Sequence, residues 1–189
     1  MDVEPAALPE LNESQRAAFE GISALADGKK AGAALLFGVT GSGKTTIYIR
    51  LIAEQRAKGR SCILLVPEIA LTPQMLRTFT AHFGDDIAVL HSSLSAGERY
   101  DEWRRIKNGD AGVVIGTRSA VFAPAADLGL IIIDEEQEDT YKSENAPRYH
   151  ARDVAKYRCA KDNALLLLGS ATPDVESRYC ACLLYTSDA

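Results

Sequence analysis

Six short apolar runs, distributed over almost the whole chain, constrain its fold more than any other feature. They cover residues 33–38, 62–67, 87–92, 112–117, 128–134 and 164–170. Each run is nearly continuous rather than alternating with polar residues, which is typical of strands that are buried on both faces of a parallel sheet. Amphipathic segments lie between the runs, at residues 44–59, 73–84, 96–109 and 150–163. Several of these segments end in Gly or Asn, as helix C-termini commonly do.

The order strand, helix, strand, repeated along the chain, predicts an α/β fold: a three-layer, open, mainly parallel sheet with helices on both faces. A chain of 189 residues is long enough for one domain with a substantial core. No apolar run approaches the roughly 20 residues of a membrane span, and residues 1–10 lack a basic region followed by an apolar one. We therefore expect a cytoplasmic protein with no membrane partner.

The charge and the cysteines narrow the class of protein further. A net charge of −5 at pH 7 argues against a general nucleic-acid binder, so any contact with nucleic acid must be local. Four cysteines, Cys62, Cys159, Cys180 and Cys182, lack the paired spacing of a metal site. We interpret Cys62 and Cys159 as small core residues.

The stretch FGVTGSGKTT follows the first apolar run and opens an amphipathic segment. It contains the pattern G-x-x-x-x-G-K-[ST], in which glycines let backbone N–H groups and a helix N-terminus face phosphate. Lys44 would reach the β- and γ-phosphate oxygens, and the hydroxyl of Thr45 would hold Mg²⁺. An ordinary glycine turn is the alternative, but the strand before the pattern and the helix after it favour nucleotide binding. The predicted nucleotide-binding residues in this stretch are Gly38, Thr40, Gly41, Ser42, Gly43, Lys44, Thr45 and Thr46.

The fifth apolar run ends in the acidic sequence DEEQ, residues 134–137. Ligands of open α/β sheets bind outside the carboxyl ends of the strands, so this sequence should meet the phosphate loop at one edge. Asp134 is placed to bind Mg²⁺, usually through a water molecule, and Glu135 to orient and deprotonate the water that attacks the γ-phosphate. Mg²⁺ would offset the repulsion between the neighbouring carboxylates. A solvated acidic turn is the alternative, and it would be preferred for Asp-Glu alone.

The segment after DEEQ is rich in aromatic and basic residues. Bases stack on rings and guanidinium planes, and cations contact phosphates, so this segment is a candidate contact for DNA close to the site of hydrolysis. The candidate residues are Tyr141, Lys142, Arg148, Tyr149, His150 and Arg152. The alternative is a surface loop followed by a helix whose Val154 and Tyr157 pack on the sheet, and composition alone leaves both open.

Seven segments together carry a family resemblance. In chain order they are GVTGSGKT, LLVPEIALTPQ, VLHSSLSAGER, VIGTRSAVFAP, IIIDEEQEDTYK, RYHARDVAKYR and LGSATPDVES, and the resemblance extends from Leu11 to Arg178. They resemble the primosomal replication-restart DNA helicases, a family of superfamily 2. The resemblance implies that residues 1–178 form a RecA-like P-loop NTPase lobe, the first, ATP-binding lobe of an ATP-dependent 3′-to-5′ DNA helicase. It also implies ATP and Mg²⁺ as cofactors.

The resemblance assigns roles that the spacing of residues does not show. LNESQ is similar to the family's adenine-recognition element, so Gln15 would contact the base. VPEIALTPQ is similar to a motif that meets the DNA backbone, which makes Thr72 and Gln74 candidates for DNA binding. GTRSA makes Thr117 and Arg118 candidates in the same way.

Two further motifs imply coupling between hydrolysis and movement. Ser170 and Thr172, in GSATP, resemble the motif that links hydrolysis to movement of the lobes. The segment after DEEQ is similar to the aromatic-rich loop that couples DNA binding to ATP turnover. Gln137 stands where family members usually have His, and we count it with the catalytic residues. Gln keeps a hydrogen-bonding side chain but cannot carry a proton, and we expect coupling to survive the difference.

The resemblance also implies partners and further parts. The partners are forked or single-stranded DNA, primosome proteins and single-strand-binding proteins, in the bacterial cytoplasm and associated with the nucleoid. The second lobe with its arginine finger, and a cysteine-rich module that binds zinc, are expected outside this chain, so nucleotide should bind but be hydrolysed poorly. The resemblance stops near Arg178, and residues 179–189 look like a tail of translated adaptor sequence.

Alternatives remain for the motifs and for the function. If the motifs have only structural roles, Pro67 and Pro73 end a strand and start a helix, and SATP caps a helix before Pro173. Arg118 is then an ordinary surface cation. For the function, one alternative to a replication-restart helicase is a lobe of another superfamily 2 translocase, of the restriction or repair type. A nucleotide-gated DNA-binding module that is inactive without its second lobe is the remaining possibility.

Overall fold

The computed structural model describes residues 6–28, 31–38 and 43–172, together with the backbone of residues 182–184. Within these residues, seven parallel strands form one sheet in the order β3-β4-β2-β5-β6-β1-β7. The strands are β1 (Gly32–Phe37), β2 (Ser61–Leu65), β3 (Ile87–Leu90), β4 (Val113–Gly116), β5 (Leu128–Ile133), β6 (Leu165–Ser170) and β7 (Cys182–Leu184). Each of β1 to β6 overlaps one of the six apolar runs, and the parallel sheet confirms the predicted fold.

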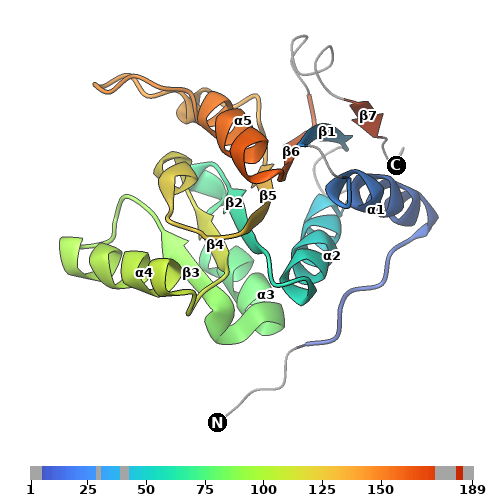
Figure 1. Cartoon of the computed structure of the whole chain (residues 1–189), viewed down its shortest axis with the longest axis horizontal. Helices are drawn as coiled ribbons and strands as arrows, with labels where there is room; N and C mark the ends of the chain where they lie inside the picture. Colours follow the sequence, from blue (N-terminus) through green and yellow to red (C-terminus); the bar gives the residue numbers. More distant parts are fainter. Residues whose placement is uncertain (1–5, 29–30, 39–42, 173–181, 185–189) are drawn as a thin grey trace.

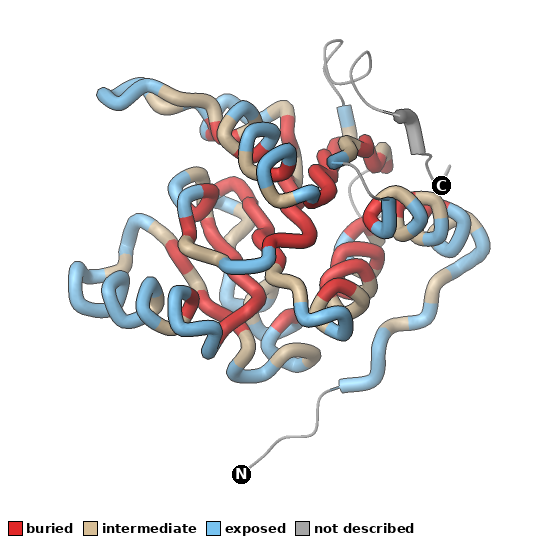
Figure 2. The backbone as a smooth tube through the Cα atoms, viewed as in Figure 1, coloured by how far each residue is buried: buried red, intermediate tan, exposed pale blue. Residues whose placement is uncertain are grey.

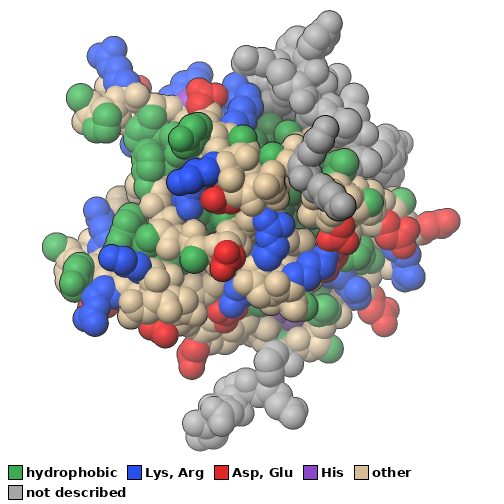
Figure 3. Space-filling view, in the orientation of Figure 1, with side chains coloured by type: hydrophobic (Ala, Val, Ile, Leu, Met, Phe, Trp, Pro, Cys, Tyr) green, Lys and Arg blue, Asp and Glu red, His purple; other side chains and the backbone are tan. Residues whose placement is uncertain are grey.

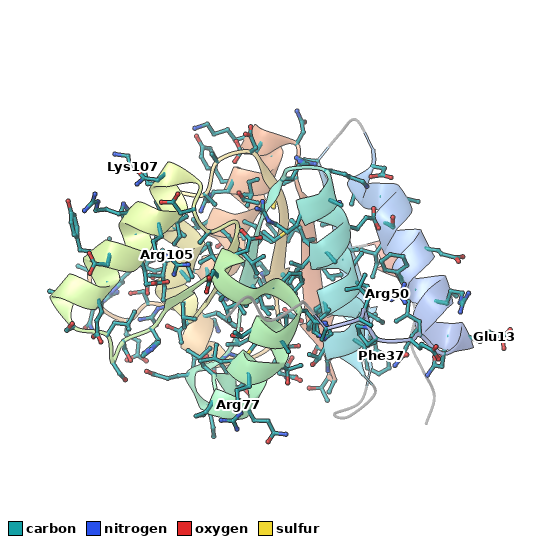
Figure 4. All side chains as sticks on the ribbon, turned by 90° about the horizontal axis from the view of Figure 1, so that it is seen from below. Glu13, Phe37, Arg50, Arg77, Arg105 and Lys107 are labelled. Atoms are coloured by element: carbon teal, nitrogen blue, oxygen red, sulfur yellow. The ribbon has the colours of Figure 1, made fainter. Side chains whose placement is uncertain are left out.

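Helices cover both faces of the sheet (Figure 1). They are α1 (Glu13–Ala26), α2 (Lys44–Ala57), α3 (Pro73–Phe83), α4 (Ala96–Asn108) and α5 (Ala151–Asp162). Short 3₁₀ turns occur at η1 (Glu68–Ala70), η2 (Gly84–Asp86), η3 (Arg118–Phe122) and η4 (Asp139–Tyr141). Helices α1, α2 and α3 pack on one face and α4 and α5 on the other, which gives the three predicted layers. Figure 4, turned to look from below, shows α2 between α1 and α3.

Alternate residues of each central strand enter two separate apolar cores. On β5, Leu130 and Ile132 join the core beneath α1, α2 and α3, whereas Ile131 and Ile133 join the core beneath α4 and α5. Every residue of β5 is buried, and Figure 2 shows the buried strands in red at the centre of the molecule. Burial on both faces explains why the sequence of this strand is apolar without interruption.

Local sequence signals fix the ends of the helices. Asn12 and Gln15 form a capping box at the start of α1, a helix that precedes the first apolar run, and a second capping box begins α4. Gly109 and Asn163 adopt left-handed conformations just after α4 and α5. These two residues confirm the prediction that Gly or Asn ends the helices.

Two of the cysteines belong to the cores, as predicted. Cys62 and Cys159 are buried and free, and burial raises the pKa of both thiols to about 12. Cys180 lies outside the described residues. None of the helices in the described part of the chain combines the length and the apolar character that crossing a bilayer would require.

The strand order brings three carboxyl ends together at one edge of the sheet. Strand β6 lies between β1 and β5, so the ends of these three strands are neighbours. The phosphate loop follows β1, DEEQ follows β5, and Ser170 is the last residue of β6. The polar sequences that we predicted to meet at this edge are therefore brought together by strands that pair side by side.

Candidate nucleotide and nucleic-acid site

The phosphate loop connects β1 to α2. The Gly38 N–H donates to the carbonyl of Ser170 at 3.1 Å, which ties the start of the loop to β6. Gly43 precedes α2 in a left-handed conformation, with φ of 82°. Because L side chains rarely adopt this conformation, the backbone itself favours glycine, and a side-chain carbon here would also displace the amide end of Gln15, whose Nε2 would lie 2.2 Å away. Thr40, Gly41 and Ser42 lie outside the described residues.

Lys44 is the first residue of α2 and is only 8% exposed. Its Nζ donates to the carbonyl of Gly38 at 2.9 Å and to Oε1 of Glu135 at 3.2 Å. The first turn of α2 contains no acidic residue, so its N-terminal N–H groups and dipole favour an anion from elsewhere. A buried ammonium beside these N–H groups is a suitable partner for phosphate oxygens.

Asp134 follows β5 and is held at both its backbone and its side chain. Its N–H donates to the carbonyl of Leu65 at 2.9 Å, and its carbonyl accepts from the hydroxyl of Tyr141 at 2.6 Å. Its Oδ1 accepts from the hydroxyl of Tyr48 at 2.8 Å. Burial raises the pKa of Asp134 above its usual range, and the hydrogen bond from Tyr48 offsets only part of that effect.

Glu135 has the opposite electrostatic environment. Burial alone would raise its pKa, but the hydrogen bond from Gln137 and the charge of Lys44 hold that pKa below its usual value. Its φ of 46° is in the left-handed region, which non-glycine residues adopt rarely and often at functional sites. Two neighbouring carboxyl groups whose pKa values shift in opposite directions are suited to different roles.

A line of hydrogen bonds runs from Glu135 to the end of β6. Nε2 of Gln137 donates to Oε2 of Glu135 at 2.8 Å, and the hydroxyl of Ser170 donates to Oε1 of Gln137 at 2.6 Å. The Thr172 N–H donates to the same hydroxyl at 3.0 Å. Because Lys44 contacts Glu135, this line joins the phosphate loop to the segment after β6.

The side chains fit a nucleotide with Mg²⁺. Thr45 and Asp134 both border a small cavity of about 40 Å³, whose lining is otherwise Tyr48 and apolar core side chains, so these two oxygen-bearing residues are close neighbours. A hydroxyl and a carboxylate supply the oxygen ligands that Mg²⁺ prefers, directly or through water. Thr46 belongs to the first turn of α2, where its N–H donates to the carbonyl of Gly43 at 3.0 Å.

Gln15 lies beside the phosphate loop, on a different element. Its Oε1 accepts from the Asn12 N–H at 3.1 Å within the capping box of α1, and its Nε2 lies against Gly43. The predicted base contact would therefore come from the start of α1, which packs against α2. The role of Gln15 in binding the base stays a prediction.

The residues predicted to contact DNA on α3 are exposed. Thr72 is the N-cap of α3, where its hydroxyl accepts from the Met75 N–H at 3.2 Å, and Pro73 is the first helical residue. The alternative in which Pro73 starts a helix is therefore correct for Pro73, and Thr72 is the residue that caps this helix. Gln74 is exposed, and neither observation tests contact with DNA.

Arg118 is more than a surface cation. Its Nη1 donates to the carbonyls of Thr140 and Lys142 at 3.1 and 2.5 Å, and its guanidinium lies 5.8 Å from the ring centre of Tyr149. Thr117 and Arg118 line a cavity of about 270 Å³. The loop after β4 therefore holds the aromatic and basic segment that follows DEEQ.

That aromatic and basic segment divides into an exposed and a buried part. Lys142 and Arg148 are exposed. Tyr149 is half-buried, with its ring edge-to-face against Phe122 at 4.9 Å. The Nδ1 of His150 accepts from the Arg152 N–H at 3.1 Å and so caps α5.

Two candidate DNA contacts in this segment face inward instead. Tyr141 is 1% exposed and bonds to the carbonyls of Asp134 and Leu65, so its ring is not available to stack on a base. Arg152 pairs with the buried Glu136 at 3.5 Å. Both residues therefore contact the DEEQ turn, Tyr141 at Asp134 and Arg152 at Glu136. Their part in coupling DNA binding to ATP turnover stays a prediction. The alternative in which Val154 and Tyr157 pack on the sheet is correct for Val154, which is partly buried against the core beneath α4 and α5, and wrong for Tyr157, which is 72% exposed.

A phosphate loop and an acidic DEEQ turn, joined by hydrogen bonds to the strand between them, are the features of a P-loop NTPase lobe. The chain belongs to the DEAD/DEAH box helicase family, whose sequence profile matches residues 12–179. It is 53% identical to the replication restart protein PriA of Bacillus subtilis (strain 168) over 167 residues, which are 88% of this chain and 21% of that protein. It is 50% identical to PriA of Treponema pallidum (strain Nichols) over 169 residues, or 89% of this chain and 25% of that protein.

The resemblance to the replication-restart helicases is thereby confirmed, although the chain spans only 21% and 25% of these two relatives. Among solved structures, RecG bound to a three-way DNA junction aligns with a TM-score of 0.68 and 25% identity, over 92% of this chain and 22% of that one. The Hef helicase domain of Pyrococcus furiosus aligns with a TM-score of 0.62 and 20% identity, over 92% of this chain and 38% of that one. The latter likeness shows the fold alone, and both agree with a RecA-like lobe.

Proposed function

We propose that this chain is the ATP-binding motor lobe of an ATP-dependent DNA helicase that acts in replication restart and primosome assembly. The observation that carries the proposal is the line of hydrogen bonds from Lys44 through Glu135 and Gln137 to Ser170. Such a line lets a change at the phosphate loop alter the position of the residues after β6. A motor requires this kind of connection between nucleotide and backbone movement.

The proposed chemistry assigns one task to each side chain of the site. Thr45 and Asp134 would hold Mg²⁺, which when bound offsets the charge of the phosphates. Nucleotide would draw Lys44 away from Glu135 and onto phosphate oxygens. Glu135, ionised at neutral pH as glutamates ordinarily are, would then accept the proton of the attacking water, while Gln137 keeps the carboxylate oriented.

DNA would bind along the same edge of the sheet. The exposed or half-buried candidates are Thr72, Gln74, Thr117, Arg118, Lys142, Arg148 and Tyr149. They follow β2, β4 and β5, which pair side by side with β2 in the middle. This local surface is compatible with a net charge of −5, because only a few cations need to meet phosphates.

The relatives supply the finer parts of the proposal. RecG, at 25% identity, is bound to a three-way DNA junction, which favours a branched DNA as substrate here. We also propose a 3′-to-5′ polarity, primosome and single-strand-binding proteins as partners, and a place in the bacterial cytoplasm at the nucleoid. The support for these finer parts is the resemblance of the sequence motifs to those of the replication-restart helicases. Zinc would belong to a part of the parent protein outside residues 1–178, which we propose as the first lobe, with 179–189 as a tail of different origin.

Calorimetry with Mg²⁺-ADP and a non-hydrolysable ATP analogue tests the nucleotide site. Lys44→Ala should weaken binding at least about tenfold, since a hydrogen bond to a charged group contributes about 1.5–3 kcal/mol. Lys107→Ala is the matched control, because Lys107 is exposed on α4, on the opposite side of the view from Phe37, the last residue of β1 (Figure 4). Circular dichroism should first show that all three proteins fold. A folded wild-type chain that binds neither nucleotide would overturn the proposal.

A further inference from the structure

Tyr48 reaches the nucleotide site from inside the core. It lies on α2 three residues after Thr45, it is 2% exposed, and its ring belongs to the core beneath α1, α2 and α3. Its hydroxyl nevertheless donates to Oδ1 of Asp134 at 2.8 Å. Since buried hydroxyl groups almost always have a partner, the position of this hydroxyl is tied to that of the carboxylate. None of the sequence motifs assigned a role to Tyr48.

Gly169 on β6 provides the space that the hydroxyl occupies. A side-chain carbon at Gly169 would lie 1.8 Å from the Tyr48 oxygen and 3.0 Å from Oδ1 of Asp134. No heavy atoms approach so closely without a bond, so any residue other than glycine would displace the hydroxyl. The tyrosine is therefore fixed by close packing against β6 as well as by its hydrogen bond.

The backbone of Asp134 is fixed independently of its side chain. The hydroxyl of Tyr141 donates to its carbonyl at 2.6 Å, and its N–H donates to the carbonyl of Leu65 at 2.9 Å. With the backbone held from β2 and η4, the remaining freedom of Asp134 is rotation of its carboxylate. Tyr48 removes that freedom.

We propose that Tyr48 is a positioning residue that presents the carboxylate of Asp134 to the Mg²⁺ of the bound nucleotide. This inference rests on the proposed function, because it requires a Mg²⁺-nucleotide at the site. The carboxylate accepts from Tyr48 and from the Glu135 N–H. A carboxylate offers about four acceptor positions, so capacity remains for the metal or its water. Partners of this kind orient metal ligands, and their loss typically lowers metal affinity about 10- to 100-fold.

The test compares nucleotide binding at many Mg²⁺ concentrations for the wild-type chain and for Tyr48→Phe, which removes one oxygen and keeps the ring. The Mg²⁺ concentration at half-maximal enhancement of ADP binding should rise at least about tenfold. Binding of ADP in the presence of EDTA should stay within about twofold of wild type, because the phosphate loop is unchanged. Tyr157→Phe is the matched control, since it removes the same atom from an exposed ring on α5.

Gly169→Ala provides a second route to the same defect. The added methyl group should displace the Tyr48 hydroxyl, raise the Mg²⁺ midpoint and lower the thermal midpoint of unfolding. In the double variant with Tyr48→Phe the clashing oxygen is gone. The thermal midpoint should then recover, while the Mg²⁺ midpoint stays as high as in Tyr48→Phe.

The outcomes separate this inference from the proposed function. A folded Tyr48→Phe chain with the wild-type Mg²⁺ midpoint would overturn the role of Tyr48 and leave the nucleotide site intact. Loss of ADP binding at every Mg²⁺ concentration, with EDTA included, would show that Tyr48 serves the fold of the loop, and this too would overturn the inference. Failure of the wild-type chain itself to bind nucleotide would overturn the proposed function and the inference with it.

Discussion

Gln137 is the residue through which the acidic turn contacts the end of β6. It donates to Glu135 and accepts from Ser170, so a single amide serves both sides of the connection. A histidine, the residue that the resemblance leads us to expect here, would offer one ring N–H and one ring nitrogen to the same neighbours. Gln makes both hydrogen bonds without carrying a titratable proton, so the connection between Glu135 and Ser170 does not depend on the protonation state of residue 137.

Gln137→Ala should uncouple hydrolysis from DNA without abolishing nucleotide binding. Two hydrogen bonds of about 0.5–1.5 kcal/mol each are lost, so DNA-stimulated ATP hydrolysis by a full-length parent should fall about tenfold. ADP affinity should change by less than about twofold, because no phosphate contact is removed. Gln137→His, measured alongside, should retain most of the stimulation. Unchanged stimulation in Gln137→Ala would remove Gln137 from the coupling pathway.

His150 gives the fold a dependence on pH. Burial, aided by the charge of Arg152, lowers the pKa of His150, while Asp153 opposes the shift and Lys142 and Lys156 add to it. An unfolded histidine titrates near 6.5. Below that value the unfolded chain binds more protons than the folded one, so stability should fall as the pH falls from about 6.5 toward the lower folded pKa.

His150→Asn tests this dependence, because Asn is a good N-cap that carries no proton in this range. Unfolding by urea at about pH 7.5 and about pH 5.5 should show a smaller loss of stability in His150→Asn than in wild type. An equal loss in the two proteins would mean that other groups, such as the carboxylates of the site, set the acid limit of stability.

At the scale of elements, the N-terminus of α3 has two roles to separate: Thr72 caps the helix, and Thr72 and Gln74 are predicted to contact DNA. Thr72→Ala should lower the free energy of unfolding by about 0.5–2 kcal/mol, since the cap at Met75 is lost, and Thr72→Ser should retain it. Gln74→Ala should leave stability within about 0.5 kcal/mol of wild type, because that side chain is exposed. Thermal unfolding checks both values.

DNA affinity separates the two roles of this helix start. Fluorescence anisotropy with labelled single-stranded DNA should show weaker binding for Gln74→Ala, although its stability is unchanged. If Gln74→Ala binds DNA as wild type does, and Thr72→Ala loses affinity only where it begins to unfold, the motif is a helix start and the DNA assignment fails.

Some elements could be predicted from the sequence because their physical cause is local. Strands buried on both faces must be apolar throughout, as β5 is, and a phosphate loop needs glycine where its backbone is left-handed, as at Gly43. The strand order, which decides that β6 lies between the two halves of the site, leaves no mark in the pattern.

Contacts between distant segments were missed for the same reason. Tyr48 meets Asp134 across 86 positions of sequence, and a tyrosine in an amphipathic helix gives no sign of where its hydroxyl ends. Tyr141 shows the converse, because a ring among basic residues suggested an exposed contact with DNA, whereas its hydroxyl is bonded to the backbone of Asp134. Composition indicates which side chains are present but not which side of the turn each one faces.

At the scale of the whole molecule, the residues that we propose as the base, the phosphate-binding lysine and the Mg²⁺ ligands all come from one edge of one sheet. The space-filling view shows Lys and Arg distributed among Asp and Glu over the face in view (Figure 3), without one continuous basic surface. Further positive charge for the transition state of hydrolysis, and a second surface for DNA, would come from parts of the parent protein beyond this lobe. Their absence should affect the rate of turnover much more than nucleotide affinity.

ATP turnover by this chain should therefore be slow and only weakly stimulated by DNA. A longer polypeptide that continues through the length of the PriA relatives should be faster by about 10³- to 10⁵-fold, the usual contribution of an arginine finger. Phosphate release with single-stranded and with forked DNA measures both rates, and Glu135→Gln in the longer polypeptide sets the background. Stimulation by forked DNA would support the replication-restart motor, and equal stimulation by unbranched duplex would favour a translocase of the restriction or repair type. A longer polypeptide that binds nucleotide and DNA but releases no phosphate above the Glu135→Gln background would make this lobe a nucleotide-gated DNA-binding module, with Glu135 no longer its catalytic base.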